Sequence, residues 1–155
     1  MKLAAWAKAN GLTYLAAWKR YKAGTLPVRA WKGDTGAILV DPATRGLIIY
    51  LRVESEAESG ELKLARENCE RYCNRRKWRV EEVIEEIGDG HSDDRTKFLQ
   101  ALDSKPTRIV TWSPEMLSKA GSGIRFLERL LPQAGCELVY VATEKIIPPV
   151  CAFTG

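Results

Sequence analysis

The pattern of hydrophobic and polar positions changes along the chain, and its longer part alternates between strand and helix. An apolar run at residues 47–50 is typical of a buried strand, which we expect over residues 47–53, whereas residues 62–77 repeat apolar positions at helical spacing. Residues 80–87 fit a strand, although their four glutamates would equally allow a helix. Strands that alternate with helices favour an α/β fold with a mostly parallel, four-stranded sheet flanked by helices. The other strands are expected at residues 108–112 and 137–141, and the other helices at residues 95–102 and 123–131.

The first 41 residues follow a different pattern, with two short helical segments and then a hairpin. Gly11 separates the two helices, and Thr13 has a side chain suited to capping the second, which we expect to run to Ala23. Two β-prone runs, residues 28–31 and 37–40, flank a glycine-rich tip. Residues 42–46 then form a short linker. We therefore expect an N-terminal domain of residues 1–41 and a body of residues 47–155.

Two short helices joined by a tight turn suit a helix-turn-helix, whose second helix enters the DNA major groove. A basic hairpin that follows such helices suits a wing that grips the DNA backbone. The order of these parts resembles the MerR-type winged helix. The alternative is a helical hairpin that packs on the body and touches nothing else. The expected DNA contacts are Thr13, Tyr14, Ala17, Trp18, Lys19, Arg20 and Lys22 on the second helix, and Arg29 and Lys32 on the wing.

Charge separates the two parts of the chain further. Residues 1–45 carry eight basic and two acidic side chains, whereas residues 46–155 carry 16 basic and 18 acidic ones. A basic N-terminal part on a near-neutral body favours double-stranded DNA as a partner. At 45% hydrophobic and 28% charged, the chain is globular. No apolar run approaches about 20 residues and no leader pattern opens the chain, so we expect a cytoplasmic protein without a membrane partner.

Cysteine usage predicts neither a metal nor a cofactor. Cys69 and Cys73 share one face of the helix expected at residues 62–77, but Cys136 and Cys151 stand apart from them. The one histidine, His91, does not complete a metal-ligand spacing. We expect buried, reduced thiols.

The carboxyl ends of the strands are the expected place for ligand chemistry in such a sheet. Arg52, Glu54 and Ser55 leave the strand at residues 47–53 together, and the segment of residues 112–119 follows another strand. Three stretches here are similar to the catalytic domain of serine recombinases, the resolvases and invertases. They are Tyr50-Leu51-Arg52-Val53, Gly90-His91-Ser92-Asp93-Asp94-Arg95 and the loop after Val110. A winged helix-turn-helix followed by this domain resembles the arrangement in the small serine transposases of insertion sequences.

This resemblance implies a serine that attacks a DNA phosphate, and arginines that neutralise the charge of the transition state. Arg52 takes the place of the first arginine and Arg95 that of the second, but the serine position falls on Glu54. The family's Asp-Arg-x-x-Arg loop falls on Glu115-Met116-Leu117-Ser118-Lys119. The long helix that follows the sheet in the family is expected to be missing. Ser55 is one residue from the nucleophile position and would face the opposite side of an extended strand.

The sequence therefore predicts a DNA-binding protein derived from a serine recombinase that does not cut DNA. It would act as a transcriptional regulator or as an accessory recombination factor, as a homodimer or with a related recombinase. One alternative is an active recombinase or transposase that uses a rearranged site and forms a phosphoserine–DNA intermediate. Another is a transcription factor whose body binds a small molecule or a protein.

Overall fold

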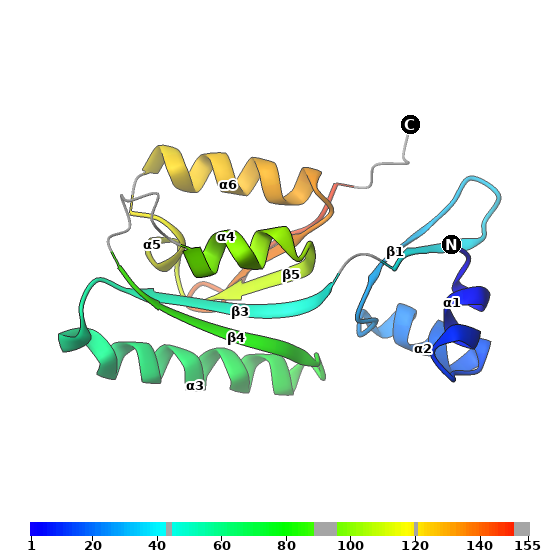
Figure 1. The fold of residues 1–155 in the computed structure, drawn as a ribbon, viewed down its shortest axis with the longest axis horizontal. Coiled ribbons are helices and arrows are strands. Elements are labelled where there is room, and N and C mark those ends of the chain that lie inside the picture. The colour runs from blue at the N-terminus through cyan, green and yellow to red at the C-terminus, as the bar shows by residue number, and fades with distance from the viewer. Residues whose placement is uncertain (43–44, 89–95, 120, 151–155) are drawn as a thin grey trace.

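The computed structural model describes residues 1–42, 45–88, 96–119 and 121–150. Figure 1 shows two parts side by side, which we call the head (residues 1–41) and the body (residues 45–150).

The head contains the two helices and the hairpin at the predicted places. They are α1 (Leu3–Ala9), α2 (Tyr14–Ala23), β1 (Arg29–Lys32) and β2 (Ile38–Asp41), and β1 pairs antiparallel with β2. The Thr13 hydroxyl oxygen accepts a hydrogen bond from the backbone N–H of Ala16 at 3.1 Å and so caps α2. Gly24 ends α2 in the left-handed conformation, with φ of 71°. The head has its own small core, formed by Leu3, Trp6, Ala7, Ala17, Ile38 and Val40.

The body is a five-stranded sheet rather than the four-stranded sheet that the sequence predicts. The strand order is β4-β3-β5-β6-β7, and every neighbouring pair is parallel except β6–β7. The extra strand, β7, is too short to give a hydrophobic period, so it leaves no signal in the sequence. Residues 80–87 form a strand and not a helix, because pairing with β3 determines their conformation. The strands are β3 (Arg45–Val53), β4 (Val80–Ile87), β5 (Pro106–Thr111), β6 (Glu137–Tyr140) and β7 (Lys145–Ile147).

Helices cover both faces of this sheet (Figure 1). Alternate residues of β3 enter different cores, because successive side chains of a strand point to opposite faces. Ile49, Leu51 and Val53 pack toward α3, whereas Ile48 and Tyr50 pack toward α4 and α6. No helix in the described ranges is long and apolar enough to cross a membrane. The helices are α3 (Ser59–Arg75), preceded by the 3-10 helix η1 (Glu56–Glu58), then α4 (Thr96–Asp103), α5 (Pro114–Leu117) and α6 (Gly121–Gln133).

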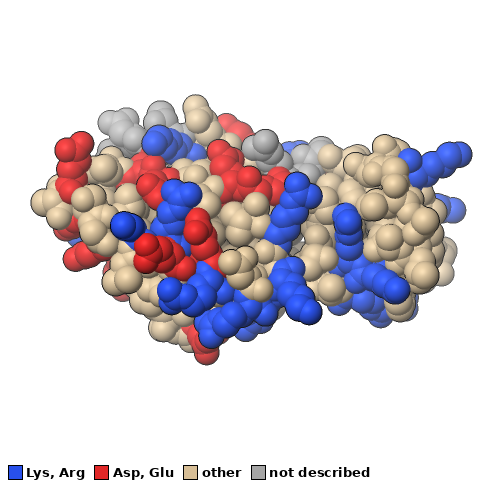
Figure 2. Space-filling model, turned by 90° about the horizontal axis from the view of Figure 1, so that it is seen from below, with Lys and Arg blue, Asp and Glu red and all other residues tan. Residues whose placement is uncertain are grey.

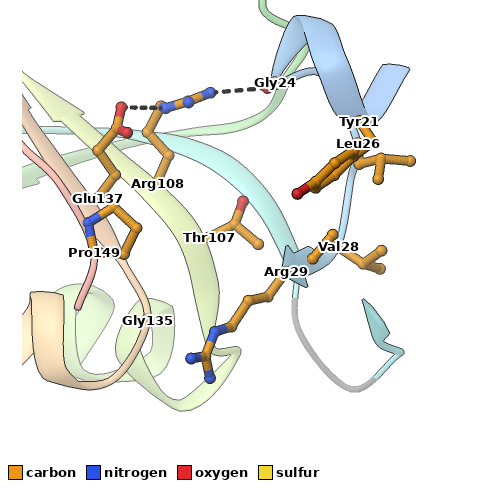
Figure 3. Close-up of a pocket in the computed structure, with 11 residues that line it drawn as sticks. Tyr21, Gly24, Leu26, Val28, Arg29, Thr107, Arg108, Gly135, Glu137 and Pro149 are labelled. Atoms are coloured by element: carbon orange, nitrogen blue, oxygen red, sulfur yellow. Dashed lines mark hydrogen bonds and ion pairs between the residues drawn. The ribbon is translucent and has the colours of Figure 1, made fainter. Parts of the chain in front are cut away.

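The head packs against the end of the sheet where the strands begin. The guanidinium of Arg108, near the start of β5, donates to the Glu137 carboxylate at 2.7 Å and to the backbone carbonyl of Gly24 at 3.2 Å (Figure 3). Arg108 also lies over the Trp78 ring, 3.8 Å from its centroid. A cavity of about 150 Å³ remains between head and body, lined by Tyr21, Val28 and Thr107 among others. Arg108 is therefore one residue that bridges both parts.

Candidate functional site

The candidate site lies where β3 ends, at the pole of the body opposite to the head (Figure 1). β3 has nine residues, which at about 3.3 Å each make it about 30 Å long. Arg52 is the last but one residue of this strand, and Glu54 and Ser55 follow its end. The short helix α5 follows the neighbouring strand β5 and lies beside the end of β3. The sequence predicts this convergence, because parallel strands end at the same edge of a sheet.

The Arg52 side chain is buried, with 3% of its surface exposed. Its guanidinium donates three hydrogen bonds to backbone carbonyls: to Gly88 at 2.8 Å, to Glu115 at 2.5 Å and to Met116 at 3.3 Å. Gly88 follows β4, and the other two carbonyls belong to α5. A guanidinium has five N–H donors, so most of this group is used inside the protein. Arg52 thus joins the end of β4 to α5.

Glu54 and Lys119 form an ion pair across the same edge of the sheet. Both side chains are partly exposed, at 40% and 38% of their surfaces. The backbone N–H of Glu54 donates to the carboxylate of Glu58 at 3.0 Å, which places another acidic group next to it. The two positions predicted for a nucleophile and a phosphate-binding arginine are thus occupied by a carboxylate and an ammonium that neutralise each other.

The structure brings together only some of the other predicted site residues. Ser55 is exposed, and so is the side chain of Glu115, whose backbone carbonyl and not its carboxylate contacts Arg52. Met116 is partly buried against the core between the sheet and α3. Arg95 lies outside the described residues. The described part of the site therefore contains two basic side chains, and both already have partners within the protein.

Glu86 is a site residue that the sequence does not reveal. It is 7% exposed and pairs with Arg52 in the register of β3 and β4. Its carboxylate accepts hydrogen bonds from the Tyr50 hydroxyl at 2.7 Å and from the backbone N–H of Lys97 at 3.0 Å. Glu86 thus fixes the start of α4 relative to β3. The four glutamates of β4 look equivalent in sequence, and only the pairing register makes this one point inward.

The predicted DNA contacts of the head are accessible with two exceptions. Ala17 is completely buried in the head core, so its place among the surface contacts is wrong. Its neighbours Ala16 and Trp18 are less buried, because the turn of the helix points position 17 inward. The side chain of Arg29 is half-buried and packs against Gly135 of the body, where an added Cβ would clash with its guanidinium. Arg29 therefore lies at the contact with the body rather than on a free wing (Figure 3). The exposed predicted contacts are Thr13, Tyr14, Trp18, Lys19, Arg20, Lys22 and Lys32.

Comparison with known proteins identifies the body. A family model described as "Resolvase, N terminal domain" matches residues 47–149, which is more than half of the chain. The search of curated proteins gives no match.

Several solved structures are similar to the body. One is the C-terminal catalytic domain of ISC1926 TnpA, an IS607-like serine recombinase, with 21% identity, a TM-score of 0.56, and coverage of 62% of this chain and 67% of that one. Another is the corresponding domain of IS1535 TnpA, with 25% identity, a TM-score of 0.55 and coverage of 62% and 70%. A third is a serine recombinase from Sulfolobus solfataricus, with 28% identity, a TM-score of 0.50, and coverage of 61% of this chain and 66% of that one.

Proposed function

Because the chain belongs to the resolvase family of serine recombinases, we propose that it binds double-stranded DNA without cutting it. In this proposal the head contacts DNA, and the body serves as a partner-binding domain in a transcriptional regulator or an accessory recombination factor. The observation that carries it is the ion pair between Glu54 and Lys119, which occupies the position where the family's attacking serine is expected.

The paired charges at the site give a phosphate little net attraction. At about 4 Å and an effective dielectric constant near 20, a carboxylate and a phosphate repel each other by about 4 kcal/mol. The ion pair with Lys119 cancels most of this repulsion. Because Lys119 is paired with Glu54, it also offers a phosphate little net attraction. Met116 stands where the family has an arginine and offers no donor to a phosphate. The pairing of Lys119 and the missing arginine donor both weaken the binding of a phosphate at this site.

Position 52 carries the arginine that the family resemblance implies, but its side chain has a structural role. A guanidinium that binds a phosphate presents two parallel N–H groups to its oxygens. Three donors of Arg52 bind the carbonyls of Gly88, Glu115 and Met116, and the side chain is buried. Freeing it would leave those carbonyls without donors, which costs about 1–3 kcal/mol for each buried group.

The head has an exposed basic and aromatic surface that suits DNA binding. Lys19, Arg20 and Lys22 are exposed on α2, and Tyr14 and Trp18 are 52% and 37% exposed beside them. The ammonium of Lys22 lies 5.6 Å from the centroid of the Trp18 ring, which limits where that charge can move. These side chains support insertion of α2 into the major groove, with cations for the flanking phosphates.

The position of the head also supports binding without cutting. The head contacts the start of β5 through Arg108 and Gly24, whereas Glu54 follows the end of β3. A duplex held by α2 in this arrangement lies about one strand length, roughly 30 Å, from the candidate site of the same protomer.

A supercoiled plasmid tests the proposal. The chain should retard the plasmid in a gel at low salt, and removal of the protein should return the plasmid still supercoiled. Replacement of Lys19, Arg20 and Lys22 by Gln should weaken the retardation. Nicked or relaxed plasmid in the wild-type reaction, absent with Ser55→Ala, would contradict the proposal.

That last outcome belongs to the second candidate function, an active recombinase that uses Ser55. It is favoured by the exposure of this hydroxyl at the same edge of the sheet as Lys119 and Glu54. Attack by Ser55 on a phosphodiester would form a phosphoserine bond and release a deoxyribose hydroxyl, which would take up the proton.

A further inference from the structure

The last part of α3 and the segment after it carry a dense group of positive charge. Residues 71–79 hold five basic and no acidic side chains, whereas residues 56–70 hold two basic and five acidic ones. All five basic side chains are exposed. We call this group the basic end of α3: Arg71, Arg75, Arg76, Lys77 and Arg79.

Little inside the protein compensates these charges. Within the described ranges, none of Arg75, Lys77 and Arg79 takes part in an ion pair. Arg71 donates to the side-chain oxygen of Asn68 at 3.0 Å, which leaves its charge in place. Arg76 lies over the rings of Tyr72 and Trp78, with its guanidinium carbon 4.6 Å and 5.3 Å from their centroids. The group is therefore a positively charged surface and not part of an internal salt-bridge network.

A chain of contacts places this surface beside α2. Trp78 lies under Arg76 and also under Arg108, and Arg108 donates to the carbonyl of Gly24, the residue that ends α2. Trp78 and Arg79 line a shallow recess together with Thr25 and Pro27 of the head. On the face that carries α3, Figure 2 shows Lys and Arg side chains gathered next to the head and continuing onto it, whereas most Asp and Glu side chains lie farther away.

Helix stability accounts for only part of this charge. A cation in the last turn of a helix gains from the negative end of the helix dipole, which applies to Arg75. Lys77 and Arg79 lie beyond the helix and do not share this benefit. Lys77 even adopts the left-handed conformation, with φ of 59°, which is unfavourable for a residue with a Cβ. A role toward an external partner explains all five charges together.

We propose that the basic end of α3 is a second contact surface for the DNA backbone, continuous with α2. The body then takes part in DNA binding and lengthens the stretch of duplex that the chain covers. The partner is the phosphate backbone, because exposed cations neutralise phosphates without distinguishing bases. This inference rests on the proposed DNA-binding function of the head.

The test measures how DNA binding by the full chain depends on salt. The variant Arg75→Gln, Lys77→Asn, Arg79→Gln removes three charges, and asparagine suits the left-handed backbone at position 77. The control variant Lys63→Gln, Arg125→Gln, Arg129→Gln removes three exposed charges from the acidic half of α3 and from α6, on the other face of the sheet. Fluorescence anisotropy of a labelled duplex of about three helical turns gives the affinity at each salt concentration, and thermal melting verifies that both variants fold.

The first variant should lower the slope of log affinity against log salt by about two to three, since each phosphate contact contributes about 0.9. Its affinity at low salt should fall at least about tenfold, while the control variant stays within about twofold of the wild type. If the first variant keeps the slope and the affinity of the wild type, this inference is overturned and the proposed function still stands. A wild-type chain without salt-dependent binding would overturn the proposed function and this inference with it.

Discussion

Glu54 and Lys119 neutralise each other at the two positions that the sequence predicts for a nucleophile and a phosphate-binding arginine. Their charges meet because β3 and β5 are neighbours and end at the same edge of the sheet. The neutral pair offers a phosphate little net attraction, although the fold around it is that of the family.

Restoring the hydroxyl alone should not restore DNA cutting. In Glu54→Ser the predicted nucleophile position carries a serine, but Arg52 remains bound to three backbone carbonyls, and Met116, at a predicted arginine position, offers no donor. We expect no covalent protein–DNA adduct with Glu54→Ser on a denaturing gel. An adduct in this variant that the wild type lacks would show that Glu54 is the single obstacle.

The buried Arg52 should contribute strongly to stability. Arg52→Met removes three hydrogen bonds and leaves the carbonyls of α5 and Gly88 without these donors, so the free energy of unfolding should fall by about 3 kcal/mol or more. Urea denaturation measures this change. The matched control is Arg66→Met, which breaks two exposed ion pairs and should cost less than about 1 kcal/mol. Equal losses in both variants would contradict the structural role of Arg52.

Arg108 should hold the head against the body. Arg108→Met removes the hydrogen bond to Gly24, the ion pair with Glu137 and the charged contact with Trp78. We expect the radius of gyration from small-angle X-ray scattering to increase, because the head separates from the sheet. Arg125→Met, an exposed change on α6, should leave it unchanged. An unchanged value with Arg108→Met would mean that other contacts suffice.

The buried cysteines should be unreactive in the native protein. Burial raises the pKa of the Cys69 and Cys136 thiols to about 12 and that of the Cys73 thiol to about 11, so almost no thiolate forms at pH 8. In a Cys151→Ser background, a thiol-specific dye should label these residues only after unfolding. Rapid labelling of the folded chain would contradict their burial.

The same thiols give a pH dependence of stability. Above the ordinary thiol pKa of 9.0 the unfolded chain loses these protons, whereas the folded chain retains them until pH 11 or 12. The unfolded state then binds fewer protons, so stability from this source falls as pH rises from about 9. Replacing Cys69 by Ala should reduce this part of the decline, as measured by urea denaturation at pH 8 and pH 10.

Most of the fold can be predicted from local sequence signals, because the apolar run before Arg52 and the helical periods are strong. What could not be predicted depends on contacts distant in sequence. Three N–H donors of Arg52 meet carbonyls contributed by β4 and α5, and no local pattern encodes that meeting. The same holds for Glu86, whose inward direction follows from its register with β3. The packing of Arg29 on Gly135 depends on how the head docks, and sequence alone places it on a wing.

We propose that this chain binds DNA without the cleavage chemistry of its family. The most direct measurement uses a labelled duplex that carries a nick, so that any cleavage releases a short fragment and traps the covalent intermediate. At a protein concentration where anisotropy shows the duplex to be bound, a denaturing gel should show free labelled strand alone. A labelled protein–DNA adduct that disappears with Ser55→Ala would contradict the claim and establish an active recombinase.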